Sequence, residues 1–222
     1  MHKLLITIDG PAGAGKTTAS KRLSDRLGYR YIDTGALYRG VALEVKDRGI
    51  NHNDDAALEK MCKSLNLKFV LNEKGTRLLS DGKDITDQIR TPEMSMLASA
   101  VSAKSIVRKR LLNIQQDMAR EKGAVFEGRD MGTVVFPGAD VKFFLDASVK
   151  TRALRRYKEL EGKTSQTLED VERDIRQRDE NDSTRALAPL KPAPDAIRVD
   201  STDLAIDDVV ELMFGHITKV IG

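Results

Sequence analysis

The sequence predicts an α/β fold, in which a parallel sheet is covered by helices on both faces and carries a small antiparallel β insert. Three observations lead to this fold class. Short apolar runs alternate with segments of helical periodicity along most of the chain, which is typical of a parallel sheet. A glycine-rich stretch directly follows the first apolar run. Two hairpin-type turns interrupt the alternation once, in the first half of the chain.

The first part of the chain predicts two strands and three helices. Residues 3–9 and 29–33 are short apolar runs that end in an aspartate, as buried strands of a parallel sheet do. Apolar residues at helical spacing follow each of these two runs and occur again in a third segment. The predicted helices run from Lys16 to a closing Gly28, through Leu37, Val41 and Val45 to Gly49, and over residues 54–65.

The antiparallel insert is predicted by turn chemistry. Residues 67–71, 76–80 and 83–85 are short strand-like runs. They are joined by residues 72–75 and by Asp81-Gly82, and both connections are good hairpin turns. Thr91-Pro92 then marks the start of a helix, and a longer helix carries Val107, Leu111, Ile114 and Met118.

Alternation resumes in the second half of the chain. The predicted strands cover residues 125–126, 141–145 and 197–199. The predicted helices cover residues 148–161, 167–179 and 206–221. With 222 residues, 40% of them hydrophobic, the chain has enough apolar material for one domain with small inserts.

Composition argues against several classes of protein. The net charge is only +3, and basic residues are interleaved with acidic ones, so no nucleic-acid partner is expected. The single cysteine, Cys62, lies in an apolar pattern and is expected to be a core residue. The first apolar run is too short for a signal peptide, and no segment is long enough to cross a bilayer. We therefore expect a cytoplasmic monomer without membrane attachment.

The strongest motif lies between the first strand and the first helix. Residues 10–17, Gly-Pro-Ala-Gly-Ala-Gly-Lys-Thr, match the phosphate-loop pattern G-x-x-x-x-G-K-[ST]. Glycines let backbone N–H groups curl around phosphate oxygens, and the following helix points its free N–H groups at the same anion. Lys16 is predicted to neutralise the β- and γ-phosphates of a nucleoside triphosphate, and Thr17 to bind Mg²⁺. The residues predicted to bind the nucleotide phosphates are Gly10, Pro11, Ala12, Gly13, Ala14, Gly15, Lys16, Thr17 and Thr18.

The phosphate loop predicts a P-loop NTPase-type sheet but leaves the reaction open. GTPases, motor ATPases and small-molecule kinases all carry such a loop. The sequence has no Asn-Lys-x-Asp motif for guanine recognition. Residues 141–145 lead into Asp146, but Ala147 follows instead of a second acid, which is more typical of a strand end than of a water-activating ATPase pair.

Two further groups of polar residues follow predicted strands. Thr34 and Arg39 come after the second strand, and Arg129 and Asp130 after the strand at 125–126. Both groups should therefore lie at the ligand-binding edge of the sheet. Arg129 could grip a phosphate with two hydrogen bonds, and Asp130 could orient or deprotonate it. The alternatives are a helix cap at Thr34, a surface arginine at Arg39 and a structural salt bridge at Arg129-Asp130.

The last candidate group lies in the arginine-rich region from 150 to 185. Many of these arginines have acids at helical spacing and are expected to form an exposed, salt-bridged helix. Arg178, Asp182 and Arg185 differ, because they flank residues 181–184, a polar stretch predicted to break the helix. Arginines on a mobile segment suit a lid that closes over a phosphoryl-transfer site. The predicted catalytic residues are Lys16, Arg129, Asp130, Arg178 and Arg185.

Five sequence blocks together resemble the bacterial cytidylate kinases: GPAGAGKTT, DTGALYR, GRDMGTVVFP, FFLDAS and RDENDSTRALAPL. They occur in order over essentially the whole chain, and all but the first are specific. The resemblance implies an adenylate-kinase-like architecture and ATP-dependent phosphorylation of CMP and dCMP. It also implies a core at 1–60, 92–150 and 190–222, a monophosphate-binding insert at about 61–91 and a lid at about 151–189.

The resemblance also implies roles for individual residues. Thr34 would reach the cytosine or ribose region, and Ser99 and Arg108 would lie on the helices that close over the base. Family members often have serine at position 34 and glycine or serine at position 17. The implied acceptor-phosphate clamps are Arg39, Arg108 and Arg129; the implied sugar contacts are Asp130 and Asp182; and the implied lid and sugar-side arginines are Arg178 and Arg185.

Two other functions remain open at this point. A phosphate-loop kinase for a non-nucleotide acceptor, such as shikimate or gluconate, would not need the region of Ser99 and Arg108 or the hairpin insert. A nucleotide-binding regulatory module would bind ATP without turning over any monophosphate.

Overall fold

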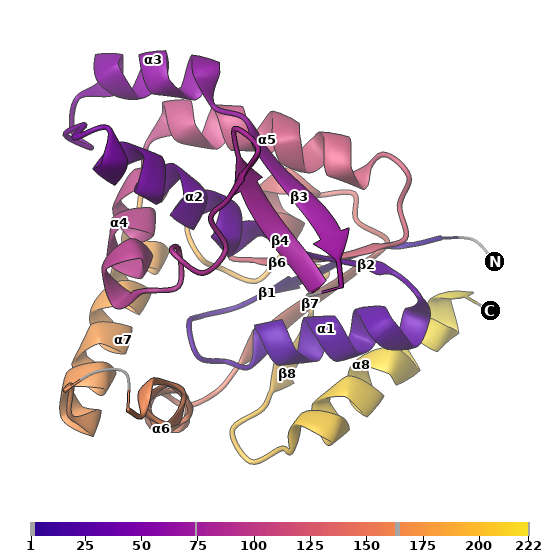
Figure 1. Cartoon of the computed structure of the whole chain (residues 1–222). Helices are drawn as coiled ribbons and strands as arrows, with labels where there is room; N and C mark the ends of the chain where they lie inside the picture. The colour runs from indigo at the N-terminus through magenta and orange to yellow at the C-terminus, as the bar shows by residue number, and fades with distance from the viewer. Residues whose placement is uncertain (1–2, 74, 163–164, 222) are drawn as a thin grey trace. The chain divides into compact units, whose positions relative to one another are not determined.

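The computed structural model describes residues 3–73, 75–162 and 165–221. The chain divides into two compact units: residues 1–32 together with 118–222, and residues 33–117. Figure 1 gives the element labels used below. Lys74 in the first predicted hairpin turn, and residues 163 and 164 of the predicted lid, lie outside the described residues.

The first unit is built on a five-stranded sheet. Its order is β2 (Arg30–Asp33), β6 (Ala124–Gly128), β1 (Leu5–Asp9), β7 (Val141–Asp146) and β8 (Ile197–Asp200). β1 pairs in parallel with β6 and with β7, and β7 pairs in parallel with β8. β1 is therefore a central strand, and all five of its residues are buried. The register pairs Asp9 with Gly128 and Phe144, so the loops after β1, β6 and β7 leave the same edge of the sheet.

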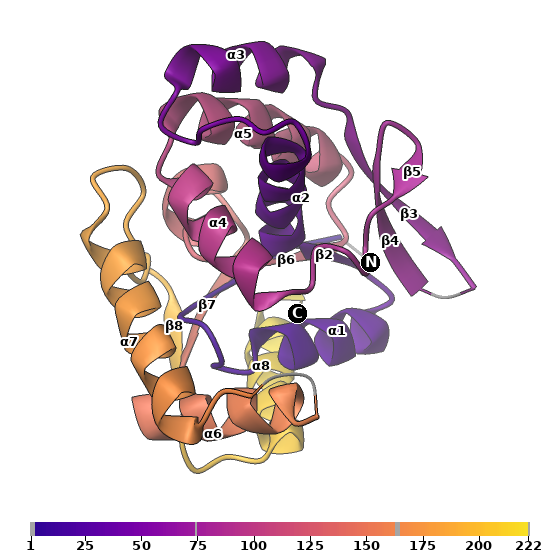
Figure 2. The same ribbon diagram turned by 60° about the vertical axis from the view of Figure 1, so that its left-hand side comes forward.

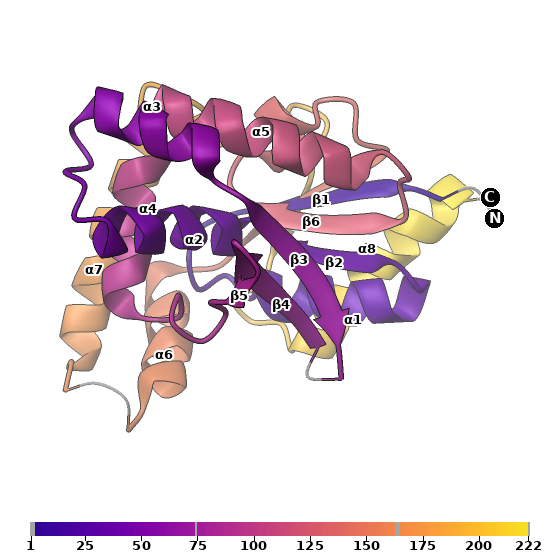
Figure 3. The same cartoon turned by 45° about the horizontal axis from the view of Figure 1, so that its top comes forward.

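Two helices cover one face of this sheet. α1 (Lys16–Leu27) and α8 (Ile206–Ile221) lie side by side (Figures 1 and 3). Their apolar faces, including Leu23 and Met213, join Ile6, Ile8 and Phe143 in one buried cluster. The helical spacing of those residues buries one stripe of each helix and leaves the rest exposed.

Two further helices form a separate pair in the same unit. α6 (Val149–Leu160) and α7 (Leu168–Thr184) pack together around Ala153, Val171 and Ile175, as Figure 2 shows. Thr167 and Asp170 form a capping box at the start of α7, which satisfies N–H groups that the helix leaves unpaired. Residues 131–135, for which the sequence predicted no regular structure, form a short π-helix, η1 (Met131–Val135).

The second unit contains four helices and the small sheet. α2 (Thr34–Asp47), α3 (Asp55–Ser64) and α4 (Pro92–Ser102) are capped by Asp33, Asp54 and Thr91 in turn. α5 (Ser105–Ala119) begins in this unit. The predicted helix start at Thr91 is confirmed. The alternative of Thr34 as a helix cap is wrong, because Asp33 caps α2 and Thr34 is the first residue of the helix.

The antiparallel insert is present. β3 (Leu67–Asn72), β4 (Gly75–Ser80) and β5 (Lys83–Asp84) form a three-stranded antiparallel sheet (Figure 3). The second turn has φ of 47° at Asp81 and 83° at Gly82, which is the backbone that Asp-Gly hairpins favour. The predicted fold class, a P-loop-type α/β sheet with a small antiparallel insert, is confirmed. No helix among the described residues has the length and apolar character to span a membrane.

Candidate active site

The phosphate loop connects β1 to α1 and has a backbone that only glycines adopt easily. φ is +145° at Gly10, +76° at Gly13 and +89° at Gly15. A β-carbon on Gly10 would lie 1.9 Å from the carbonyl oxygen of Leu145, so a side chain cannot be accommodated there. The first turn of α1 has no acidic side chain. Its N–H groups and helix dipole therefore favour an anion at this point.

Lys16 lies in the first turn of α1 and is buried, with an exposed fraction of 6%. Its ammonium group donates to the carbonyl oxygen of Pro11 at 2.6 Å, within the loop itself. Burial and the charge of Arg129 lower the pKa of Lys16 to about 7; Glu127 opposes this, and Arg178 adds to it. An anion bound in the loop would relieve this cost, because it would supply the negative charge that Lys16 lacks.

Thr17 is held by an acid on the neighbouring strand. Its hydroxyl donates to Glu127 Oε1 at 2.8 Å. Glu127 is a buried residue of β6 with an exposed fraction of 6%. A hydroxyl and a carboxylate side by side are the hard oxygen donors that Mg²⁺ prefers. Asp146 on β7 instead accepts from the N–H of Ala147, and its side chain is 52% exposed, which agrees with its prediction as a strand end.

A buried carboxylate surrounded by three arginines forms the second part of the site. Asp182 is 3% exposed, and its Oδ2 accepts from Arg129 Nε at 3.0 Å. Arg178 Nε lies 3.9 Å from the same oxygen, and Arg185 Nη1 lies 3.8 Å from Oδ1. Burial alone would raise the pKa of Asp182, but the arginine charges outweigh it and hold the pKa below its usual value. Arg185 also approaches Asp130 Oδ1 at 3.7 Å. Five of the predicted site residues therefore lie together: Arg129, Asp130, Arg178, Asp182 and Arg185.

The predicted helix break at residues 181–184 is wrong, because α7 continues to Thr184. Ser, Thr, Asn and Asp side chains can compete for the backbone hydrogen bonds of a helix, but in α7 they are accommodated within the helix. The hydroxyls of Ser183 and Thr184 donate back to the carbonyl oxygen of Glu180, and Gln177 bonds Asn181 one turn away. Asp182 is buried among arginines. Arg178 and Asp182 therefore lie on a helix, and Arg185 lies at its C-cap.

The remaining predicted residues belong to the second unit. Arg39 Nη2 binds Asp33 Oδ2 at 2.8 Å, while the other oxygen of Asp33 caps α2 at Ala36 N. The Nε of Arg39 is buried and has no hydrogen-bond partner among the described residues. Arg39 is thus a partly buried guanidinium with one unsatisfied donor, not an exposed surface arginine. Thr34, in the first turn of α2, is 2% exposed.

Ser99 and Arg108 are linked through Ser102. The Ser102 hydroxyl donates to the carbonyl oxygen of Ser99 at 2.7 Å. The Ser102 carbonyl oxygen accepts from Arg108 Nη1 at 3.2 Å. The guanidinium of Arg108 also lies 5.8 Å from the ring centroid of Tyr38, within cation–π range. Three elements of the second unit, α2, α4 and α5, therefore contribute to the surroundings of Arg108.

The family to which the chain belongs follows from its similarity to known proteins. Residues 6–219 match the family model described as cytidylate kinase. The chain belongs to the cytidylate kinase family. A cytidylate kinase of Geobacter sulfurreducens is 51% identical over 211 residues, which cover 95% of this chain and 91% of that protein. One from Pasteurella multocida is 43% identical over 98% of this chain and 96% of its own length.

Solved structures of other kinases share the fold of this cytidylate kinase family member. A shikimate kinase from Acinetobacter baumannii, solved in complex with shikimate, aligns with a TM-score of 0.50 over 98% of this chain and 94% of its own, at 15% identity. A gluconokinase from Sinorhizobium meliloti aligns with a TM-score of 0.50 over 98% and 93%, at 13% identity. At such identities the likeness concerns the fold alone.

Two buried residues of the cytidylate kinase fold were missed by sequence reasoning. Glu127 was not among the predicted site residues, although an acid directly after the apolar strand 125–126 is a possible signal. Arg152 was grouped with the exposed arginines, but it is 4% exposed. Its guanidinium donates to Ala147 O at 2.8 Å and to Ala12 O in the phosphate loop at 3.1 Å, and pairs with Asp179 at 2.7 Å. Arg152 therefore ties the phosphate loop to both α6 and α7.

Proposed function

We propose that this chain transfers the γ-phosphoryl group of ATP to CMP and to dCMP, as a monomer in the cytoplasm. The observation that carries the proposal is the convergence of charge between the phosphate loop and the arginine cluster. Lys16 in the loop experiences the charges of Arg129 and Arg178, which belong to the cluster around Asp182. Phosphoryl transfer needs cations on both sides of the moving group. Family membership supports a nucleoside monophosphate as the acceptor.

The reaction consists of one exchange of bonds. An oxygen of the CMP phosphate forms a bond to the γ-phosphorus, while the bond from that phosphorus to the oxygen bridging to the β-phosphate breaks and ADP leaves. The protein contributes positioning and charge. In our proposal, residues 10–18 hold the ATP phosphates, and Lys16, Arg129, Arg178 and Arg185 neutralise the charge that spreads over the equatorial oxygens.

The acceptor side of the proposal rests on the roles that the resemblance to cytidylate kinases implies. Arg39, Arg108 and Arg129 would clamp the CMP phosphate, since a guanidinium can bind two of its oxygens at once. The buried Nε of Arg39, which has no partner among the described residues, supports this role. We further propose that Thr34, Ser99, Asp130 and Asp182 contact the base and the sugar.

Magnesium fits the donor set next to the phosphate loop. Thr17 and Glu127 present a hydroxyl and a carboxylate 2.8 Å apart, beside the loop that would hold the ATP phosphates. We propose that Thr17 binds Mg²⁺, with Glu127 orienting its hydroxyl. When bound, the ion neutralises β- and γ-phosphate charge.

Removal of magnesium should abolish activity. EDTA is expected to stop ADP release, and added Mg²⁺ to restore it, because the phosphates need a hard cation. Glu127→Gln should raise the Mg²⁺ concentration that gives half-maximal rate by roughly tenfold or more. Asp146→Asn is the matched control, since Asp146 is the exposed acid at the end of β7. Full activity in metal-free buffer, or an equal shift in both variants, would contradict the assignment.

Asp130→Ala should separate CMP from dCMP. Asp130 is 2% exposed and lies 3.7 Å from Arg185 Nη2, so the substitution removes an acceptor for sugar hydroxyls. If the main contact is the 2′-hydroxyl, kcat/KM should fall roughly tenfold or more for CMP and less for dCMP. Equal losses would indicate the 3′-hydroxyl or the positioning of Arg129. Unchanged kinetics in a folded variant would remove Asp130 from the site.

A panel of acceptors tests the proposed function as a whole. Coupled measurement of ADP release with CMP, dCMP, UMP, AMP and shikimate should give the highest kcat/KM with CMP and dCMP. Turnover of shikimate with none of the nucleotides would favour a non-nucleotide kinase. ATP binding without turnover on any acceptor would favour a regulatory module.

A further inference from the structure

A buried carboxylate immediately precedes the phosphate loop. Asp9, the last residue of β1, is 3% exposed. Burial raises the pKa of Asp9 to about 6; hydrogen bonds from Gly132 and Met131 oppose the rise, and the nearby Asp130 adds to it. A buried acid destabilises the fold unless its partners compensate. Its retention in the sheet therefore calls for an explanation beyond packing.

Both oxygens of Asp9 bind backbone groups at the start of η1. Oδ1 accepts from Met131 N at 2.9 Å, and Oδ2 accepts from Gly132 N at 2.7 Å. The first N–H groups of a helix have no partner within it, and here the first intrahelical bonds are those of Val134 and Val135 to the carbonyl oxygen of Asp130. Asp9 thus caps η1 from a strand that is 122 residues away in sequence.

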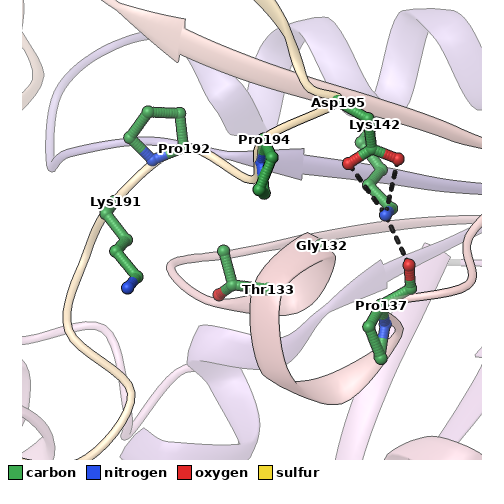
Figure 4. A pocket seen from close by; sticks show the side chains of 8 residues that line it. All are labelled: Gly132, Thr133, Pro137, Lys142, Lys191, Pro192, Pro194 and Asp195. Atoms are coloured by element: carbon green, nitrogen blue, oxygen red, sulfur yellow. Dashed lines mark hydrogen bonds and ion pairs between the residues drawn. The ribbon is translucent and has the colours of Figure 1, made fainter.

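The turn that Asp9 holds has little room to move. A β-carbon on Gly132 would lie 3.1 Å from Thr7 Oγ1 and 3.2 Å from the Lys142 side chain. Lys142, paired with Thr7 across β1 and β7, bonds the carbonyl oxygen of Pro137 and the carboxylate of Asp195 (Figure 4). The segment from Met131 to Pro137 is therefore fixed near both ends by charged side chains of adjacent strands.

The segment fixed in this way begins directly after Arg129 and Asp130. The bonds to Met131 N and Gly132 N fix the backbone that directly follows these two residues. We propose that Asp9 is a positioning residue that sets the direction of Arg129 and Asp130 towards the acceptor by capping η1. This inference rests on the proposed function, in which both residues contact the acceptor. The charges of Asp130 and Lys16 both act on the pKa of Asp9, the first raising it and the second lowering it.

Asp9→Asn tests the proposal with nearly unchanged shape. The amide keeps one acceptor oxygen but presents an N–H₂ group to the second backbone N–H, which breaks one of the two bonds. We expect kcat/KM for CMP to fall roughly tenfold or more, as small displacements of catalytic groups do, while KM for ATP changes less than about twofold. Amide hydrogen exchange at Met131 and Gly132 should become faster in the variant.

Asp140→Asn is the matched control. Asp140 also accepts from a backbone N–H of β1, from Leu5 N at 2.7 Å, but at the opposite end of the strand. Weakening this contact in Asp140→Asn should lower the melting temperature without changing the kinetics with CMP. Gly132→Ala is a second variant, which retains the carboxylate and displaces the turn instead, and it should reproduce the loss on CMP.

A double substitution shows whether Asp9 acts through its neighbours. If it does, adding Asp9→Asn to Asp130→Ala should lower kcat/KM for CMP by much less than the product of the separate effects. Fully independent effects, wild-type CMP kinetics in both Asp9→Asn and Gly132→Ala, or equal losses for CMP and ATP would overturn the proposal. A wild-type protein that does not phosphorylate CMP would refute the proposed function instead, and amide exchange would still report on the capping contact.

Discussion

Lys16→Ala should lower kcat with CMP by roughly 10²- to 10³-fold, the range measured when one preorganised charge-stabilising donor is removed from an enzyme. The ammonium group lies in the first turn of α1, where the loop would present the β- and γ-phosphates. Its positive charge acts most strongly when negative charge moves during transfer. The measurement is steady-state ADP release at saturating ATP and CMP, with ATP binding followed separately.

The fold should survive this substitution. Burial and the neighbouring Arg129 charge lower the pKa of Lys16 to about 7, which means that the surrounding protein groups disfavour the charged form of this side chain. The melting temperature should therefore stay close to that of the wild type. Lys21→Ala on the same helix is the control, since Lys21 is exposed and lies 5.5 Å from the Tyr31 ring centroid. Near-normal turnover in Lys16→Ala with intact ATP binding would refute the phosphate-loop assignment.

The parts of the fold that local chemistry determines were predictable from the sequence. The phosphate loop is a continuous stretch whose glycines, lysine and threonine stand at fixed offsets. The turn at Asp81-Gly82 has the expected positive φ values. Thr91 with Pro92 begins α4 as capping rules require. In each case the residues that determine the structure are neighbours along the chain.

Contacts between distant strands could not be predicted in this way. Glu127 meets Thr17 because β6 lies next to β1 in the sheet, and the order of strands is not written in any local pattern. Asp9 contacts Met131 and Gly132 for the same reason. Arg152 differs from the exposed arginines around it because a loop 140 residues earlier lies against its side chain. Burial of a charged residue is a tertiary property, so helical spacing alone does not reveal it.

The end of α7 shows how tertiary contacts override local preference. Residues 181–184, Asn-Asp-Ser-Thr, have weak helix propensity, and the sequence predicted a break there. The ion pair of Asp182 with Arg129 ties this turn of α7 to the loop that follows β6. An arginine on one segment and an acid on another thus extend the helix by more than a turn beyond the predicted end.

Arg129→Lys should weaken the enzyme's use of the acceptor CMP more than its use of ATP. Arg129 donates through Nε to Asp182 at 3.0 Å and through Nη1 to Gly128 O at 3.2 Å, so its planar group is fixed and can face an acceptor phosphate with its remaining donors. Lysine keeps the charge but loses the fork that binds two oxygens at once. We expect kcat/KM for CMP to fall roughly 10- to 100-fold, a loss of about 1.4 to 2.7 kcal/mol.

The kinetics with each substrate decide whether Arg129 binds the acceptor or only supports the fold. KM for ATP should change by less than about threefold, and Arg39→Lys and Arg108→Lys should show the same selectivity if all three arginines clamp the CMP phosphate. Arg173→Lys is the control, because Arg173 on α7 forms an exposed pair with Asp170 at 3.1 Å. This substitution should leave the kinetics with both ATP and CMP unchanged. A purely structural Arg129–Asp182 pair predicts instead a lower melting temperature in Arg129→Lys, with the affinities for ATP and CMP falling together or not at all. That result would remove Arg129 from the acceptor site and leave the cluster around Asp182 as a support for α7.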